Sequence, residues 1–395
     1  MVVFATAGLV ISQALARMPA VRDAVGASTG ELGLALVGAG LGSLLAMPFT
    51  GWLIDQVGSR TVVRVCIVLA SLGWGSVGLV DTPWMLGLVL LLTGAPFGIW
   101  DVAMNVQGSY VEQLRSRSLM PFFHAAFSAG TVLGAGMGAL AAYLGVGLVQ
   151  LPVVSIIGLT VGLVAVRQFV PESDADLPAE TTPAGGAGDA DGAGPQPEPA
   201  TRRGVSRLEI LLGLVCLGGA LAEGSANDWL ALLLVDVQGA PAAFGALALM
   251  AFNVAMTIGR LLGSPAIDHF GRQRVAQAGG ALAIIGILMV SQVSSLPVAL
   301  LGGLVWGLGT ATIFPAAISA AGEVPGRGNR AITVVSTIAY GAFLFGAPTI
   351  GLLAEVVGLD RALFVVIGCV LLMVVLARTL NPAVLAGQSH RGSVR

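Results

Sequence analysis

Long apolar stretches alternate with short polar interruptions along almost the whole chain of 395 residues. A helix needs about 20 predominantly apolar residues to cross the hydrocarbon core of a bilayer. Breaks at proline, glycine and charged residues divide the chain into twelve stretches of this kind, which are 2–20, 31–54, 61–81, 83–111, 119–144, 147–168, 208–233, 241–266, 274–294, 297–321, 330–356 and 361–380. The pattern therefore predicts an all-α membrane protein with twelve transmembrane helices.

One polar segment separates the sixth expected span from the seventh. Residues 171–206 include the run PAGGAGDADGAGPQPEPA, and a stretch so rich in proline, glycine and acid buries too little apolar surface to fold. We therefore expect a six-helix bundle over 1–170, a disordered linker over 171–206, a second six-helix bundle over 207–381 and a tail over 382–395.

Composition excludes several classes of protein. Apolar residues make up 56% of the chain and charged residues 10%, whereas a soluble domain carries about 25% charged residues. The net charge of −2 argues against a nucleic-acid partner. The chain contains no lysine, so it lacks the phosphate-binding loop of an ATP-driven pump. Three histidines give no metal-ligand spacing, and no catalytic motif occurs, so we expect no metal, no cofactor and no enzymatic activity.

Arginine placement predicts the orientation of the chain. If both termini are cytoplasmic, the cytoplasmic loops and tail hold fifteen arginines, and the outer loops hold three, Arg17, Arg22 and Arg361. Because cytoplasmic loops of membrane proteins are enriched in basic residues, we expect both termini in the cytoplasm.

A short motif occurs twice, after the second and after the eighth expected span. The segments GWLIDQVGSR (Gly51–Arg60) and GSPAIDHFGRQR (263–274) both contain Asp-x-x-Gly, at an offset of 213 residues. A matching motif at equivalent places indicates an internal duplication, which is common in transporters.

The motif also has a mechanical interpretation. Its carboxylate can cap a helix N-terminus or pair with arginine, and its glycine allows a tight turn. We expect a lock that stabilises the conformation closed to the cytoplasm, formed by Gly51, Asp55, Gly58, Arg60, Arg260, Asp268, Gly271 and Arg272.

These residues resemble the signature of the major facilitator superfamily, Gly-x-x-x-Asp-[Arg/Lys]-x-Gly-[Arg/Lys]-[Arg/Lys], although Gln56 and Ser59 replace basic positions. The resemblance implies two pseudo-symmetric six-helix bundles around a cavity lined mainly by spans one, four, seven and ten. The segment FGIWDVAMNVQ (Phe97–Gln107) is similar to span four of the fucose permease group of proton symporters, and other segments resemble a bacterial subgroup near it. We therefore expect a multi-pass protein of the bacterial inner membrane.

Two acids lie near the middle of their expected spans, where a charge is costly and usually functional. Asp101 is followed one helical turn later by Asn105, and Glu223 in the same way by Asn227. We predict that both acids bind a polar solute and carry coupling protons. The alternative is a structural hydrogen bond between helices.

Other polar residues inside the spans are weaker candidates. Gln13, Arg17 and Asn253 are expected to bind the solute, and His124 to relay protons. Arg17 could instead extend toward the membrane surface, and His124 could make a packing hydrogen bond. Aromatic stacking on a ligand is a further option at Trp100, Trp306 and Tyr340, but packing is the favoured role there.

The sequence thus favours a secondary active transporter that moves a small polar solute together with protons, as a monomer in the lipid bilayer. A drug or metabolite exporter driven by proton antiport is the first alternative. A receptor or an intramembrane enzyme is the second, but the chain offers neither an output domain nor a catalytic constellation. Substrate, direction and coupling ion stay open at this point.

Overall fold

The computed structural model describes residues 1–115, 119–170, 205–324 and 328–381. The first half of the chain contains α1 (Val2–Leu15), α2 (Met18–Val25), α3 (Thr29–Ala46), η1 (Met47–Phe49), α4 (Thr50–Val57), α5 (Ser59–Ser76), η2 (Val77–Leu79), α6 (Pro83–Arg115), α7 (Met120–Tyr143), α8 (Gln150–Ala165) and η3 (Val166–Gln168). The second half contains α9 (Arg207–Asp236), α10 (Ala242–Phe270), α11 (Arg272–Gln292), α12 (Leu296–Thr310), α13 (Ile313–Gly322), α14 (Gly328–Val357), α15 (Leu359–Ala362), α16 (Phe364–Leu376) and η4 (Ala377–Leu380). The expected linker and tail lie almost entirely outside the described residues.

The expectation of twelve spans is confirmed. In the described residues eleven helical segments are long and apolar enough to cross a membrane, and α1 with α2 makes a twelfth that is bent by 49°. Proline accounts for the breaks inside spans, because it lacks the backbone N–H that continues a helix. Pro19 lies in the first turn of α2, Pro48 between α3 and α4, and Pro315 in the first turn of α13.

The two halves repeat the same helix pairings. In the first half α1 packs on α7, α3 on α6, and α5 on α8. The equivalent pairs in the second half are α9 with α14, α10 with α12, and α11 with α16. This repetition in space agrees with the duplication that the doubled motif indicates.

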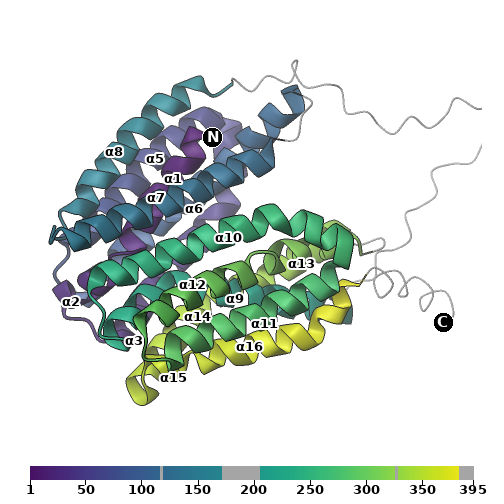
Figure 1. Cartoon of the computed structure of the whole chain (residues 1–395). Coiled ribbons are helices and arrows are strands. Elements are labelled where there is room, and N and C mark those ends of the chain that lie inside the picture. Colours follow the sequence, from purple (N-terminus) through teal and green to yellow (C-terminus); the bar gives the residue numbers. More distant parts are fainter. Residues whose placement is uncertain (116–118, 171–204, 325–327, 382–395) are drawn as a thin grey trace, which may run out of the picture.

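The halves meet mainly through two helix pairs, α3 with α14 and α7 with α10, and α2 also contacts α9. Figure 1 shows the helices of the two halves close together near α2, α3 and α15, and diverging toward the opposite end. We call the end where residues 170 and 205 lie the linker end, and the opposite end the far end.

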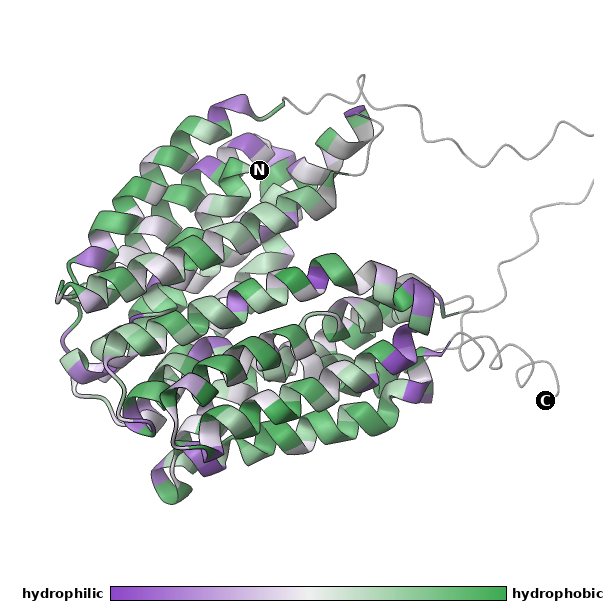
Figure 2. Cartoon of the chain, in the orientation of Figure 1, coloured by the Kyte–Doolittle hydropathy of each residue, from purple (hydrophilic) through white to green (hydrophobic). Residues whose placement is uncertain are grey.

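Apolar side chains cover the outer faces of the helices. Figure 2 shows green, hydrophobic residues along the length of the helices and purple residues concentrated near their ends. Leu133, Leu371 and Val375 are examples of large apolar side chains that are more than half exposed. A surface of this kind is stable in contact with lipid chains, which supply no hydrogen bonds and require none.

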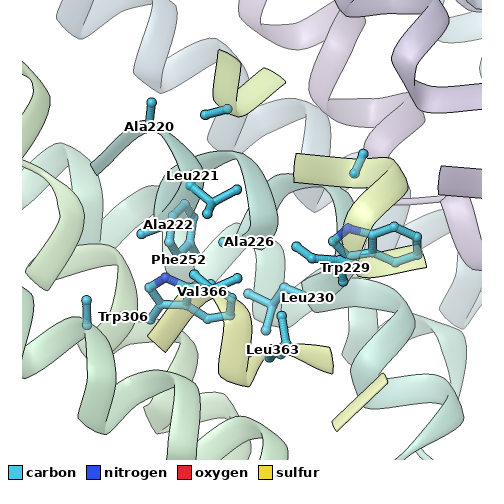
Figure 3. Close-up of a cluster of buried hydrophobic side chains, with 14 of the residues drawn as sticks. Ala220, Leu221, Ala222, Ala226, Trp229, Leu230, Phe252, Trp306, Leu363 and Val366 are labelled. Atoms are coloured by element: carbon cyan, nitrogen blue, oxygen red, sulfur yellow. The ribbon is translucent and has the colours of Figure 1, made fainter. Parts of the chain in front are cut away.

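Each half has its own packed interior. In the second half Trp306 lies edge-on to Phe252, with ring centroids 6.0 Å apart, among side chains of α9 and α16 (Figure 3). Trp306 and, in the first half, Trp100 are fully buried, so both pack inside a half in this conformation. Tyr340 differs from them, because 38% of its surface is exposed.

Glycines allow the closest helix contacts. A side chain at Gly130 or Gly134 of α7 would overlap backbone atoms of α1, and one at Gly42 of α3 would overlap the backbone of α6. Without a hydrophobic driving force in lipid, such close approach supplies much of the attraction between helices.

Replacing Gly130 with alanine is expected to force α1 and α7 apart and to lower the free energy of unfolding by about 1–3 kcal/mol, the usual cost of overpacking. Thermal unfolding in detergent measures the change. Gly368→Ala is the matched control, since Gly368 lies in helix α16 with no atom near its missing side chain. Equal stability of the two variants would show that the α1–α7 contact does not limit stability.

Candidate functional site

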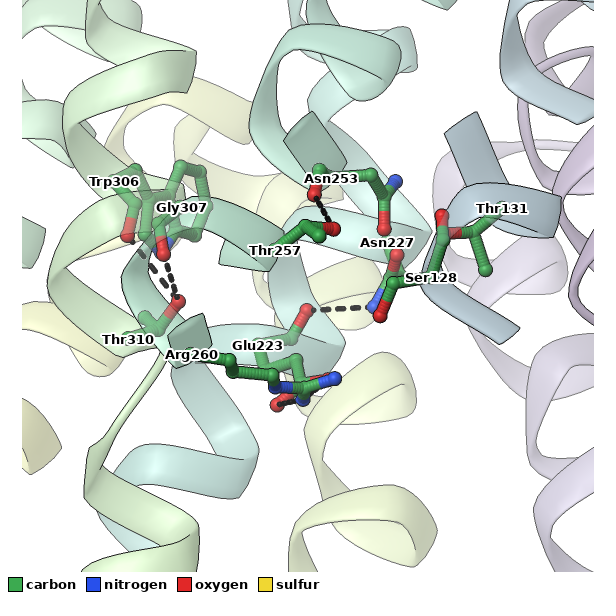
Figure 4. A network of polar contacts seen from close by, with 10 residues as sticks. All are labelled: Ser128, Thr131, Glu223, Asn227, Asn253, Thr257, Arg260, Trp306, Gly307 and Thr310. Atoms are coloured by element: carbon green, nitrogen blue, oxygen red, sulfur yellow. Dashed lines mark hydrogen bonds and ion pairs between the residues drawn. The ribbon is translucent and has the colours of Figure 1, made fainter. Parts of the chain in front are cut away.

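An ion pair joins α9 to α10 in the second half. The Nη2 atom of Arg260 on α10 donates to both carboxylate oxygens of Glu223 on α9, at 3.0 and 3.3 Å (Figure 4). Both side chains are partly buried. Sequence reasoning placed Arg260 in the gating motif with Asp268, but the structure brings it to Glu223. The available signal was a lone arginine in an apolar span, which requires a counter-charge.

Amide side chains surround this pair. Asn227 donates to the backbone oxygen of Glu223 at 3.1 Å, and Asn253 donates to that of Leu249 at 2.9 Å. These bonds stay within one helix, and each uses one of the two N–H donors of the amide. In the described residues the two amide oxygens accept no hydrogen bond, so they can receive donors from a bound molecule.

The first half contributes α7 to the same region. Figure 4 draws Ser128 and Thr131 of α7 beside Asn227 and Asn253, on the side where α7 packs against α10. His124, nearer the linker end of α7, is exposed and lies within Coulombic reach of Arg260. The side chains of the two halves therefore face one another here.

Asp101 and Asn105 lie on one face of α6, as their spacing predicts. Asn105 donates to the backbone oxygen of Asp101 at 2.8 Å and to its Oδ1 at 3.4 Å. The charge of Asp101 acts on Tyr340 of α14, so this face also looks toward the other half. Within the described residues Asp101 forms no ion pair. The same holds for Asp228, which lies nearer the far end of α9.

The structure does not bring Gln13 and Arg17 to this cluster. Gln13 is fully buried inside the first half, where it bonds Ser155 and Gln150 of α8. Arg17 is 5% exposed and donates to the backbone oxygen of Val146 at 3.0 Å. Val146 lies in the loop that joins α7 to α8 at the far end, so the guanidinium of Arg17 points toward that end of the span.

The doubled motif has the same backbone geometry in both halves. Gly58 has φ 77° and ψ 149°, and Gly271 has φ 80° and ψ 151°. A residue with a side chain is strained at these backbone angles, so both positions require glycine. Gly51 lies on α4 with free space beside it.

The charged residues of the motif divide into two groups. Asp55 and Asp268 are exposed, and neither belongs to an ion pair of the described residues. Arg60 donates to the backbone oxygen of Arg167 at 2.5 Å. Arg272 makes a two-bond ion pair with Glu323, whose pKa the hydrogen bonds lower below its usual 4.5. At the linker end these contacts stay within one half, so among the described residues no contact of the motif joins the two halves there.

At the far end an ion pair does join the halves. Arg22 on α2 bonds Asp236 at the end of α9, and also bonds Asp23. Sequence reasoning missed this pair, because Arg22 and Asp236 are 214 residues apart and each looks like an ordinary surface charge.

Comparison with known proteins identifies relatives along the whole chain. The sequence profile of the Major Facilitator Superfamily matches residues 1–255 and 229–393. An uncharacterized MFS-type transporter of Yersinia pestis is 31% identical over 374 residues, which cover 94% of this chain and 91% of that one. An uncharacterized transporter of Sinorhizobium fredii is 32% identical over 378 residues, 95% of each chain. Among solved structures, the nucleoside transporter NupG superimposes with a TM-score of 0.72 at 13% identity, over 96% of each chain.

Replacing Asp55 with asparagine is expected to shift the protein further toward the conformation that is open at the linker end, because a contact of the closed conformation is lost. Spin labels at Thr61 and His269, both exposed and on opposite halves at this end, report the separation. Gln56→Ala, on the same exposed turn, serves as the control. If Asp55→Asn gives the same distance distribution as the wild-type protein, Asp55 does not stabilise the closed conformation.

Proposed function

Because the chain belongs to the major facilitator superfamily, we propose that it is a secondary active transporter that moves a small polar solute, coupled to protons, by alternating access. The observation that carries this proposal is the polar cluster between the halves. Glu223, Asn227 and Asn253 lie together beside Arg260, and Asp101 lies with Asn105 on one face of α6, all inside spans that are mostly apolar.

The amides and hydroxyls of the cluster are suited to a neutral, hydroxyl-bearing solute. Asn227 and Asn253 offer amide oxygens, and Ser128 and Thr131 offer hydroxyls from the opposite half. A solute that bonds both groups would hold the halves together in an occluded state. Gln13 and Arg17, predicted as ligands from the sequence, would reach such a solute only after the first half rearranges.

Charge balance separates the roles of the two acids. Glu223 is neutralised by Arg260, and breaking a partly buried pair is costly. Asp101 has no cation paired with it in the described residues. An unpaired carboxylate inside a membrane is stable only if it binds a proton or another cation. We therefore assign proton coupling to Asp101, with His124 and Glu223 as the alternatives.

Orientation follows from the arginine distribution. With the termini in the cytoplasm, the linker end, where the helices of the two halves diverge, is the cytoplasmic end. The relatives of known origin are bacterial, which supports the inner membrane as the location. A monomer contains both halves of the cluster, so no second copy is needed for transport.

The test begins with a thermal-shift and uptake screen of polar solutes in proteoliposomes, with and without a pH gradient. In Asp101→Asn, which mimics the protonated acid, we expect solute binding and exchange to persist and accumulation driven by the pH gradient to be lost. Asn105→Ala is the matched control, because it retains the acid and removes its neighbour. It should weaken binding without uncoupling.

Glu223→Gln separates the alternatives. Loss of solute binding would make Glu223 a ligand, whereas loss of accumulation alone would make it the proton site. If Asp101→Asn accumulates the solute as well as wild type, the assignment to Asp101 is wrong and passes to Glu223 or His124.

A further inference from the structure

A third copy of the acid-x-x-Gly motif lies at the far end of the molecule. Its sequence is Glu355-Val-Val-Gly358, at the junction of α14 and α15. Gly358 has φ 89° and ψ 153°, close to the angles of Gly58 and Gly271. The same helix–glycine–helix turn therefore occurs at both ends of the molecule.

Glu355 contacts the other half. Its Oε1 accepts hydrogen bonds from the Ser28 hydroxyl and, at 3.1 Å, from the backbone N–H of Gly30. Ser28 is the N-cap of α3, where it also forms a capping box with Glu31. The free N–H groups and the helix dipole make this end of α3 electropositive, so a carboxylate is stabilised there.

Close packing of α3 on α14 brings the carboxylate to this position. A Cβ atom at Gly30 would lie 2.6 Å from Oε1 of Glu355. One at Gly33 would lie 2.7 Å from the backbone oxygen of Ala347. Small residues at these places let the two helices approach closely enough for the carboxylate to reach the helix end.

The state of the motif differs between the two ends. At the far end, where the halves meet, the motif acid is bonded across them. At the linker end, where the helices diverge, Asp55 and Asp268 are exposed and make no ion pair among the described residues. We propose that Glu355 is a latch that holds the far end closed by capping α3, and that its release accompanies opening of that end. This rests on the proposed alternating access.

A latch must be weak enough to break in each cycle. Glu355 is exposed, so water can replace Ser28 and Gly30 as its hydrogen-bond partners when the far end opens. The net free energy lost on opening is therefore small. The neighbouring pair of Arg22 and Asp236 adds a second bond between the halves at the same end. Loss of one of the two should therefore shift the conformational equilibrium without unfolding the protein.

The experiment measures the separation of the halves at the far end in lipid nanodiscs, without any solute. Spin labels are placed at Leu144 and Ser294, exposed positions on opposite halves, after Cys66, Cys216 and Cys369 are replaced. Glu355→Ala and Ser28→Ala are each expected to raise the ratio of long to short distances, on the order of threefold to tenfold for Glu355→Ala. Asp81→Asn, an exposed acid at the same end that makes no ion pair in the described residues, should leave the ratio unchanged.

A double variant tests the specific contact. Because Ser28 acts through Glu355, the combination Ser28→Ala/Glu355→Ala should not exceed Glu355→Ala alone. Additive effects would mean that the two residues act separately, which contradicts the latch. If Glu355→Ala does not fold, Glu355→Gln and Ser28→Ala provide the same comparison.

The outcomes also separate the latch from the proposed function. If Asp55→Asn changes the distances at the linker end but the Glu355 and Ser28 variants match wild type at the far end, the latch is wrong and alternating access stands. If none of these variants changes a distance at either end, the halves do not move and alternating access itself fails.

Discussion

The interior of a lipid bilayer offers no hydrogen-bond partner, and this constraint governs the whole structure. Every backbone N–H and C=O group in the spans must be hydrogen-bonded inside a helix. Every charged side chain far from the membrane surface must be paired or must serve a function. Most charged residues accordingly lie near helix ends. Asp101, Asp228 and the Glu223–Arg260 pair are exceptions, because they lie inside the spans. The charged side chains that remain inside the spans therefore indicate where the functional site lies.

The same constraint explains how two halves can move as units. Within a half, glycines and buried aromatic residues such as Trp306 hold the helices in close contact. Between the halves, several contacts are small or polar, such as the Arg22–Asp236 pair. These contacts between the halves can break at one end of the molecule while equivalent contacts form at the other end. The loss of each contact is offset by hydration or by a new partner.

Sequence reasoning predicted the fold well and the partners of the site poorly. Span number and the glycine turns at Gly58 and Gly271 follow from local rules of hydropathy and backbone angle, so the sequence reveals them. The pairing of Arg260 with Glu223 and the inward position of Gln13 depend on helix rotation and packing. The hydropathy pattern does not determine these contacts, because apolar residues occur on all sides of long spans such as α9. The short motif at Glu355 was visible but was overlooked, because its acid lies at the opposite end from the other two.

Alternating exposure of the cluster around Asp101 and Glu223 is tested most directly by measuring both ends of wild-type protein under the same conditions. Spin-label pairs at Thr61 and His269 for the linker end, and at Leu144 and Ser294 for the far end, are compared in nanodiscs as pH is varied. We expect two distance populations at each end, with any gain of the long distance at one end matched by its loss at the other. A single distance at both ends under all conditions, or opening of both ends together, would contradict alternating access.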